Sequence, residues 1–290
     1  MLENTESPIL ITGKSGQLST ALQAGCAARG LPYIALGRKE MDITNKVKVE
    51  ATVRSIAPAV ILHTAALTDV DGAEREPERC VDINVRGTQH LLEAAAAVKA
   101  SFLYISSDYV FRGDGQLPLA VDAAPSPVNQ YGFTKWLGEE AVKAYPYPWW
   151  IVRTSWLFGG KGKHFARTIA EQALKERKIS VVDDQCGAPT YVTDLAETIF
   201  FILDKSPGIY HAANRGHCSR WEWAQYIYWR VGREPSHVDR INSRQRKQEA
   251  KRPAYSVLDL SKLVESSIPQ LRDWQAAVDD YLALEGWLDD

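Results

Sequence analysis

Three side chains, Ser107, Tyr131 and Lys135, occur in an order that suits the reduction of a carbonyl group. A ketone accepts hydride readily when its oxygen is protonated or polarised as charge develops, so the site needs an acid and a second hydrogen-bond donor. Tyr131 is the candidate acid and Ser107 the second donor. Lys135 lies one helical turn after Tyr131, where an ammonium group can lower the pKa of a phenol toward roughly 7. The trio predicts a carbonyl reductase.

A glycine turn favours this catalytic interpretation, because Tyr-x-x-x-Lys spacing alone also fits an amphipathic helix with a surface lysine. The turn lies between a strand-like run and a helix-like segment, residues 9–12 and 21–29. Gly13 and Gly16 would let the backbone approach a pyrophosphate, which the N–H groups of the helix N-terminus would then meet. Ser19 replaces the third glycine of the dinucleotide-binding fingerprint and is small enough to keep helix and strand close.

The first half of the chain contains the elements that must position these residues. Strand-like runs alternate with helical patterns, and the strands are expected at residues 9–12, 33–36, 60–63, 102–106 and 150–153. Such alternation predicts βαβ units and an α/β fold, a Rossmann-like doubly wound parallel sheet. Functional loops in such sheets cluster at the carboxyl ends of the strands, and the candidate residues fall there.

The second half mixes helical segments with short strands. Helices are expected near residues 164–176, 193–203 and 219–231, with strands near 179–182 and 209–212. We expect residues 1–153 to form mainly an NAD(P)-binding Rossmann domain, and residues 154–290 mainly a smaller C-terminal substrate-binding lobe interleaved with the first. The charged stretch 240–251 is typical of a solvated face, and one of its arginines is a candidate for contact with an anionic ligand.

Composition narrows the class of protein. The 290 residues are 45% hydrophobic and carry a formal net charge of −2, which argues against a nucleic-acid binder. No apolar run reaches membrane-spanning length and the first residues lack the pattern of a signal peptide, so a cytoplasmic protein without membrane contact is expected. The four cysteines are scattered, which favours free thiols over a zinc site or a disulfide framework. No metal site is expected.

Taken in order, the motifs resemble the extended short-chain dehydrogenase/reductase superfamily and, within it, the dTDP-4-dehydrorhamnose reductase family. The resemblance covers nearly the whole chain, and the stretches that carry it are residues 13–18, 64–71, 107–111, 153–156 with 160–162, and 184–190. Three departures from the family pattern are Ser19 in place of glycine, Ser107 where threonine is common, and Leu67 where an aromatic residue or histidine often occurs. None of them removes a chemical function.

The resemblance implies a role for further residues. Those expected at the cofactor are Gly13, Gly16, Gln17 and Leu18 at the pyrophosphate, Asp42 and Ile43 at the adenine, Ala65, Ala66 and Leu67 along its middle, and Tyr131 and Lys135 at the nicotinamide ribose. Those expected at the deoxyhexose and its diphosphate are Thr68, Val70, Ser107, Asp108 and Trp156. The flat apolar face of a tryptophan can cover sugar C–H groups, although core packing would also explain Trp156.

The residues that follow the second predicted strand indicate which cofactor binds. Arg38 and Lys39 stand where an acidic residue would bind a free ribose 2′-hydroxyl, and cations there suit a 2′-phosphate. Glu40 follows and weakens this preference. NADPH is therefore the expected cofactor with NADH as a second option, and a solvent-exposed basic turn is the alternative interpretation of Arg38.

The resulting functional prediction is NADPH-dependent reduction of the C4 ketone of dTDP-4-dehydro-6-deoxy-L-mannose (dTDP-4-dehydro-L-rhamnose) to dTDP-L-rhamnose. Two alternatives stay open: a related sugar-nucleotide 4-ketoreductase that makes another 6-deoxyhexose, and a non-catalytic regulatory subunit that keeps the fold as a dinucleotide-binding module. The expected partner is a small sugar-nucleotide substrate, and the protein is expected to be a monomer or a homodimer.

Overall fold

A parallel sheet of six strands dominates the computed structural model, which describes residues 7–246 and 248–288. Across the sheet the strands lie in the order β10-β5-β4-β3-β1-β2. Their bounds are β1 Ile9–Thr12, β2 Tyr33–Leu36, β3 Val60–His63, β4 Ser101–Ser107, β5 Trp149–Thr154 and β10 Gly208–His211. Because the order reverses at β1, which lies between β2 and β3, the prediction of a doubly wound parallel sheet is confirmed.

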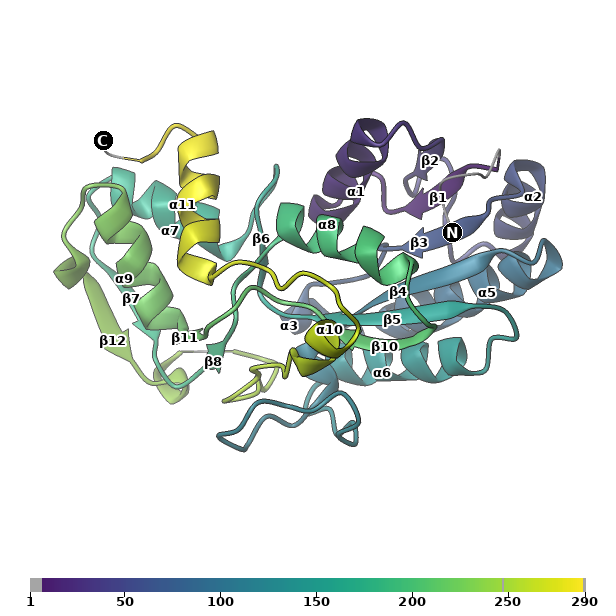
Figure 1. The fold of residues 1–290 in the computed structure, drawn as a ribbon. Helices are drawn as coiled ribbons and strands as arrows, with labels where there is room; N and C mark the ends of the chain where they lie inside the picture. Colours follow the sequence, from purple (N-terminus) through teal and green to yellow (C-terminus); the bar gives the residue numbers. More distant parts are fainter. Residues whose placement is uncertain (1–6, 247, 289–290) are drawn as a thin grey trace.

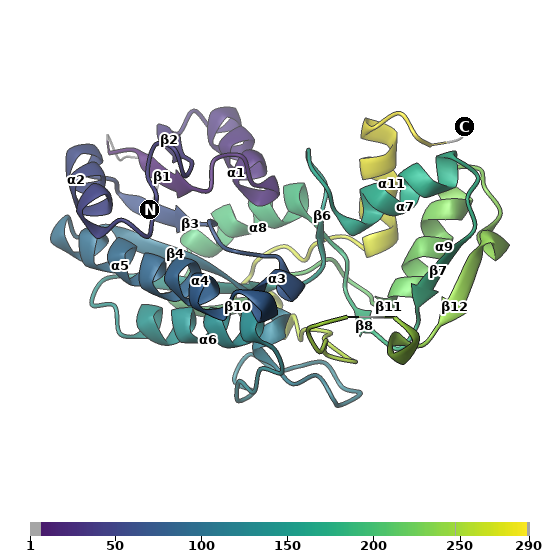
Figure 2. The same cartoon turned by 180° about the vertical axis from the view of Figure 1, so that it is seen from behind.

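Helices cover both faces of this sheet (Figures 1 and 2). They are α1 Gln17–Ala28 and α8 Val192–Leu203 on one face, and α2 Lys46–Ile56, α5 Gly87–Ala97 and α6 Gln130–Lys143 on the other. Alternate residues of β1 explain the two layers, since Ile9 and Ile11 pack with α1 and α8 whereas Leu10 packs with α2 and α5. A strand buried on both faces has a continuous apolar sequence, which is the pattern of residues 9–12.

A second lobe is built around its own aromatic core. Its elements are α7 Phe165–Leu174, β7 Ile179–Val182, α9 Arg220–Arg230, β12 Val238–Ile241 and α11 Trp274–Leu284. Trp223, Tyr228 and Tyr281 are fully buried in this core. Helix α9 begins with a capping box, in which the Ser219 and Glu222 side chains bond each other's backbone N–H groups. In Figure 1 this lobe lies to the left of the parallel sheet.

The chain after residue 153 contributes to both lobes, because α8 and β10 return to the first sheet. Short parallel or antiparallel pairs lie on the connecting segments, β6 Leu157–Phe158 with β9 Thr190–Tyr191 and β8 Cys186–Gly187 with β11 Cys218–Ser219. The remaining helical segments are α3 Val70–Arg75, α4 Pro77–Val81, the π-helical turn Asp82–Arg86, α10 Ser261–Glu265 and the 3₁₀ turns Asp108–Val110, Pro235–His237 and Ser243–Gln245. Within residues 7–246 and 248–288, no helix is both long and apolar enough to cross a bilayer.

Candidate active site

One cavity of about 900 Å³ opens at the carboxyl ends of the parallel strands and reaches the second lobe. Of the residues that the sequence places at a cofactor or substrate, exposed Lys39 does not line it, and these do: Gly13, Gly16, Gln17, Leu18, Arg38, Asp42, Ile43, Ala65, Ala66, Leu67, Thr68, Val70, Ser107, Asp108, Tyr131, Lys135 and Trp156. The lining also includes residues that the sequence did not single out, among them Tyr109, Thr154, Lys161, Lys163 and Arg220. The cavity therefore brings these predicted residues together.

The glycine turn brings the backbone close to the next loop. Gly13 has a φ of +76°, and a Cβ at this position would lie 3.1 Å from the Ala65 Cα. Gly16 precedes α1 without a side-chain cap, so the first N–H groups of the helix are free of a capping oxygen. The Gln17 Nε2 atom is buried and has no hydrogen-bond partner among the described residues. A free helix N-terminus with an unpartnered amide donor fits the pyrophosphate of a dinucleotide.

The end of β2 carries two ion pairs. Arg38 Nε lies 3.1 Å from Asp42 Oδ2, and its side chain is 75% exposed at the rim of the cavity. Glu40 instead accepts a hydrogen bond from the Gly37 N–H at 3.1 Å and lies 3.4 Å from Lys14 Nζ. Glu40 is thus held by its own loop, and Arg38 remains the cation at this end of the cavity.

Helix α6 contains both Tyr131 and Lys135. Asn129 caps it by accepting the Gly132 N–H at 2.8 Å, so Tyr131 and Lys135 fall in its first two turns. A Cβ at Gly132 would overlap the Tyr109 carbonyl oxygen. Only glycine permits this close approach, which places Tyr131 beside the end of β4, where Ser107 lies.

Burial dominates the titration of this pair. It raises the pKa of Tyr131 well above its ordinary value, and the interaction with the neighbouring Ser107 hydroxyl opposes that rise. Burial also lowers the pKa of Lys135 to about 7, while its Nζ lies 4.0 Å from the centre of the Tyr104 ring. The lowered phenol pKa that the spacing predicts is therefore wrong for this structure. The phenol is held protonated at neutral pH, which is the state that a proton donor requires.

Unpartnered polar atoms lie next to the phenol. The Ser107 hydroxyl donates to Asp108 Oδ1 at 2.8 Å and accepts the Tyr109 N–H at 3.2 Å. Asp108 is 2% exposed, and burial raises its pKa to about 6. Its Oδ2 atom and Thr154 Oγ1 are buried without a hydrogen-bond partner in the described part of the chain. Because both residues line the cavity, these oxygens are available to the hydroxyl groups of a ligand.

Trp156 is held in a strained backbone conformation by the groups around its ring. Its φ is +47°, which costs about 1–3 kcal/mol for a residue other than glycine. The ring stacks on Trp223 at 5.9 Å and 14°, and the Arg220 guanidinium lies 3.6 Å from its centre. Gly187 leaves room for it, since a Cβ there would lie 2.6 Å from a ring carbon. Trp156 thus packs against the second lobe and lines the cavity.

Asn84 is a positioning residue that the sequence did not reveal. It is 1% exposed and lies in the π-helical turn. Its Oδ1 accepts the Leu67 N–H at 2.8 Å, and its Nδ2 donates to the Leu67 carbonyl at 3.2 Å and to Thr134 Oγ1 at 3.1 Å. These bonds tie the loop after β3 to α6. A polar residue at the start of a helical pattern gives no sign of such long-range contacts.

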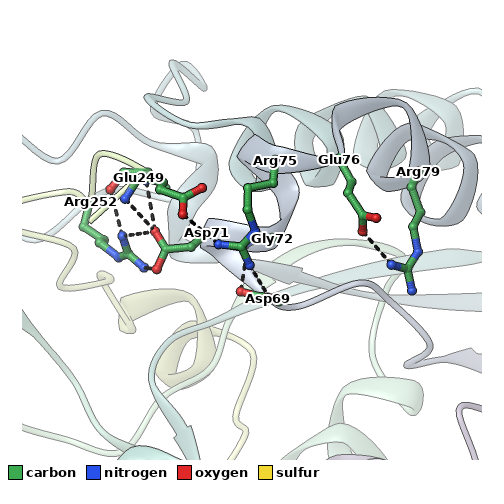
Figure 3. Close-up of polar contacts among 9 residues, drawn as sticks. Asp69, Asp71, Gly72, Arg75, Glu76, Arg79, Glu249 and Arg252 are labelled. Carbon is green, nitrogen blue, oxygen red and sulfur yellow. Dashed lines mark hydrogen bonds and ion pairs between the residues drawn. The ribbon is translucent and has the colours of Figure 1, made fainter. Parts of the chain in front are cut away.

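A second set of polar contacts joins α3 to residues 249–252. Figure 3 shows the Asp71 carboxylate facing the Arg252 guanidinium, with two contacts of 2.7 Å. Asp71 Oδ1 also accepts the backbone N–H groups of Glu249 and Ala250. The bonds from Arg252 hold the pKa of Asp71 well below its usual range. The Asp71–Arg252 pair anchors α3, whose first residue, Val70, lines the cavity.

Comparison with known proteins places this chain in a family. Residues 7–285 match the family model described as the RmlD substrate binding domain. The chain belongs to this family. A dTDP-4-dehydrorhamnose reductase from Mycolicibacterium smegmatis is 40% identical over 280 residues, which are 95% of this chain and 85% of the relative. A dTDP-4-keto-6-deoxy-D-glucose reductase from Streptomyces niveus is 32% identical over 271 residues, 93% of this chain and 94% of the relative.

A solved structure agrees with these relatives. The dTDP-4-dehydrorhamnose reductase of Bacillus anthracis, in complex with NADP, superposes with a TM-score of 0.93 at 34% identity and covers 97% of this chain and 100% of its own. The resemblance inferred from the sequence motifs is confirmed at the level of the family.

Proposed function

We propose that this protein is an NADPH-dependent reductase of the C4 ketone of dTDP-4-dehydro-L-rhamnose and that its product is dTDP-L-rhamnose. The observation that carries the proposal is the shared cavity, which is lined both by the glycine turn with Gln17 and by Ser107, Tyr131 and Asp108. Relatives named dTDP-4-dehydrorhamnose reductase, including one solved with NADP, support this substrate and this cofactor.

The dinucleotide cofactor would be held mainly by backbone groups. Residues 16–18 would bind the pyrophosphate, Asp42 and Ile43 would flank the adenine, and residues 65–67 would border the middle of the dinucleotide. Arg38 would leave Asp42 to bind the 2′-phosphate, which offers more charge than one carboxylate. Bound there, the nicotinamide ring supplies the hydride.

The chain's own groups would then handle the proton. Tyr131 donates from its phenol to the developing alkoxide, and its raised pKa keeps the donor protonated at neutral pH. The Ser107 hydroxyl has one proton, which it gives to Asp108 in this structure, so rotation about its Cβ–Oγ bond would redirect it to the ketone oxygen. Lys135 would bind the ribose and stabilise the phenolate left after the transfer.

The substrate half would be formed by residues from both lobes. Thr68 and Val70 would border the sugar from the loop after β3, and Asp108 would accept hydrogen bonds from its hydroxyl groups through the unpartnered Oδ2. Trp156 would cover an apolar face of the ring. We accordingly propose residues 154–290 as the main substrate-binding part and residues 1–153 as the main cofactor-binding part.

A second candidate is reduction of a different 4-keto-6-deoxyhexose nucleotide. The Streptomyces niveus relative, named for such a sugar, favours keeping it. Such an enzyme would take a sugar of another configuration or deliver hydride to the other face of the ketone. A non-catalytic dinucleotide-binding subunit is the weaker alternative, because such a module has no need for Ser107, Tyr131 and Lys135 in one cavity.

The test is direct. The purified protein is incubated with NADPH and, in separate reactions, with dTDP-4-dehydro-L-rhamnose or dTDP-4-keto-6-deoxy-D-glucose. Oxidation of NADPH is followed by absorbance, and the product is identified by NMR. We expect dTDP-L-rhamnose, with turnover lost in Tyr131→Phe. A different C4 epimer would move the assignment to the second candidate, and cofactor binding without turnover of either sugar would favour the non-catalytic module.

We propose that the protein is cytoplasmic, because reduced dinucleotides and sugar nucleotides are made there, and that it is a monomer or a homodimer. Cell fractionation tests the first, and sedimentation of the purified protein tests the second. A membrane-bound fraction or a larger oligomer would contradict them.

A further inference from the structure

Arg220 is a cation in the cavity to which neither the sequence motifs nor the reaction above gives a role. It is the first residue of α9, and the capping box at Ser219 and Glu222 fixes where that helix begins. The side chain is half-buried and lines the cavity. Its guanidinium carbon lies 3.6 Å from the centre of the Trp156 ring and 5.0 Å from that of Phe165. The second lobe thus presents this cation to the side of the cavity that contains Trp156.

The guanidinium group is free to bind an anion. Within residues 7–246 and 248–288, no side chain or backbone group forms a hydrogen bond or an ion pair with it. Burial lowers its pKa, whereas the nearby Tyr109 and Asp108 raise it. The guanidinium lies over the Trp156 ring, and its N–H donors have the fixed fork geometry that matches the oxygens of a phosphate.

The other cations of the cavity lining are engaged or lie elsewhere. Arg38 pairs with Asp42 and Arg79 with Glu76, while the Lys135 amine lies over the Tyr104 ring. Lys161 and Lys163 are exposed on the loop that follows Gly160, where a Cβ would lie 3.8 Å from the Gln17 Cα, whereas Arg220 is half-buried. Among the described lining residues, Arg220 is therefore the half-buried arginine without an ion-pair partner.

We propose that Arg220 binds the diphosphate of the sugar nucleotide and, through its stack on Trp156, fixes the distance between that diphosphate and the sugar ring. The inference rests on the proposed function for the identity of the nucleotide. Two negative charges on the substrate would gain a partner in a site shielded from water, and the group that holds them is already oriented by an aromatic ring. Arg220 would select for a diphosphate-linked sugar over a free one.

The test compares Arg220→Gln with a matched control, Arg240→Gln. Arg240 also lies over a tryptophan, with 5.3 Å to the Trp221 ring centre, but its side chain is 65% exposed and it does not line the cavity. Calorimetric titration measures the affinities of each variant for dTDP, thymidine and NADPH without turnover. We expect Arg220→Gln to bind dTDP about tenfold or more weakly, since a charge-assisted hydrogen bond is lost, and to bind thymidine and NADPH as the wild type does.

Arg220→Lys is a second variant that keeps the test decisive if Arg220→Gln fails to fold. It keeps the positive charge and should retain part of the preference for dTDP over thymidine. The inference is overturned if Arg220→Gln keeps the wild-type ratio of dTDP to thymidine affinity, or if both affinities fall together, as a purely structural role would require. Failure of the wild type to bind dTDP would overturn it as well. Since these are binding measurements, an absence of reductase activity would contradict the proposed function while leaving the test of Arg220 intact.

Discussion

Replacement of Lys135 by methionine should stabilise the folded protein while removing its activity. Lys135 is 3% exposed, and burial lowers its pKa to about 7 from an ordinary value of 10.5. The unfolded chain therefore binds this proton more tightly than the folded protein does. Stability is fully present above the unfolded pKa, declines as the pH falls from about 10.5 to about 7, and then levels off.

The expected gain in free energy of unfolding follows from the pKa shift of Lys135. A change from 10.5 to about 7 is roughly 3.5 pKa units, or about 4–5 kcal/mol in total at 1.36 kcal/mol per unit. The linkage relation gives a cost of about 4 kcal/mol at pH 7, about 2 kcal/mol at pH 9 and less than about 0.5 kcal/mol near pH 10.5. Methionine keeps the apolar stem and has no charge to desolvate, so Lys135→Met should recover these amounts.

Urea denaturation of both proteins at pH 7, 8, 9 and 10 without cofactor gives the difference in free energy of unfolding. Titrating groups that do not interact with Lys135 cancel in this difference, whereas His63 and Cys80 are coupled to its charge. Lys143→Met, at the exposed end of the same helix, is the control and should show no such gain. Turnover should fall about 10²–10⁴-fold in Lys135→Met only, as expected for loss of a group that supports proton transfer. A stability difference that does not change with pH would refute the reasoning.

Three further predictions concern single positions. Tyr131→Phe should keep its NADPH affinity and lose about 10²–10⁴-fold in kcat, measured by stopped-flow absorbance, because only the acid is removed; near-normal kcat would contradict the assignment. Asp71→Asn should lose about 2–3 kcal/mol of unfolding free energy at pH 7, when Arg252 loses its bidentate partner. The carboxyl pKa is depressed in the folded state, so this loss should begin to shrink below about pH 4 and disappear only as the pH falls through the much lower folded pKa; a loss that does not shrink at all in acid would be the wrong result. Arg38→Ala should raise KM for NADPH about tenfold and leave KM for NADH unchanged, whereas equal changes would exclude a 2′-phosphate contact.

The strands were predictable because burial on both faces leaves a direct mark on the sequence. β1 and β3 have the predicted bounds, Ile9–Thr12 and Val60–His63, since every residue in them is buried. The start of α1 was less clear. It begins at Gln17 rather than near residue 21, because a glycine and serine sequence without a capping side chain has the composition of a loop.

The predicted lining residues come mostly from loops that follow neighbouring parallel strands, so chain order alone places them at one edge of the sheet. Arg220 lacked any such signal. The sequence instead suggested an arginine from the stretch 240–251, but Arg240 pairs with Asp183 on the surface and Arg220 enters from the start of α9. The capping box reveals where that helix begins. Which cavity its first residue faces depends on how the second lobe packs, and no local pattern encodes that.

The pKa values of the catalytic pair show the same division between local spacing and tertiary environment. Spacing of four residues makes Tyr131 and Lys135 neighbours, and a charge effect alone would lower the phenol pKa. Desolvation opposes the charged form of each group, and it comes from residues far away in the chain, such as Tyr104 on β4 beneath the amine. Because burial acts on both partners, it keeps the Tyr131 phenol protonated and also lowers the pKa of the Lys135 amine. A sequence motif can therefore identify a proton donor and its neighbour, while the pH at which they work is decided by the depth at which the fold encloses them.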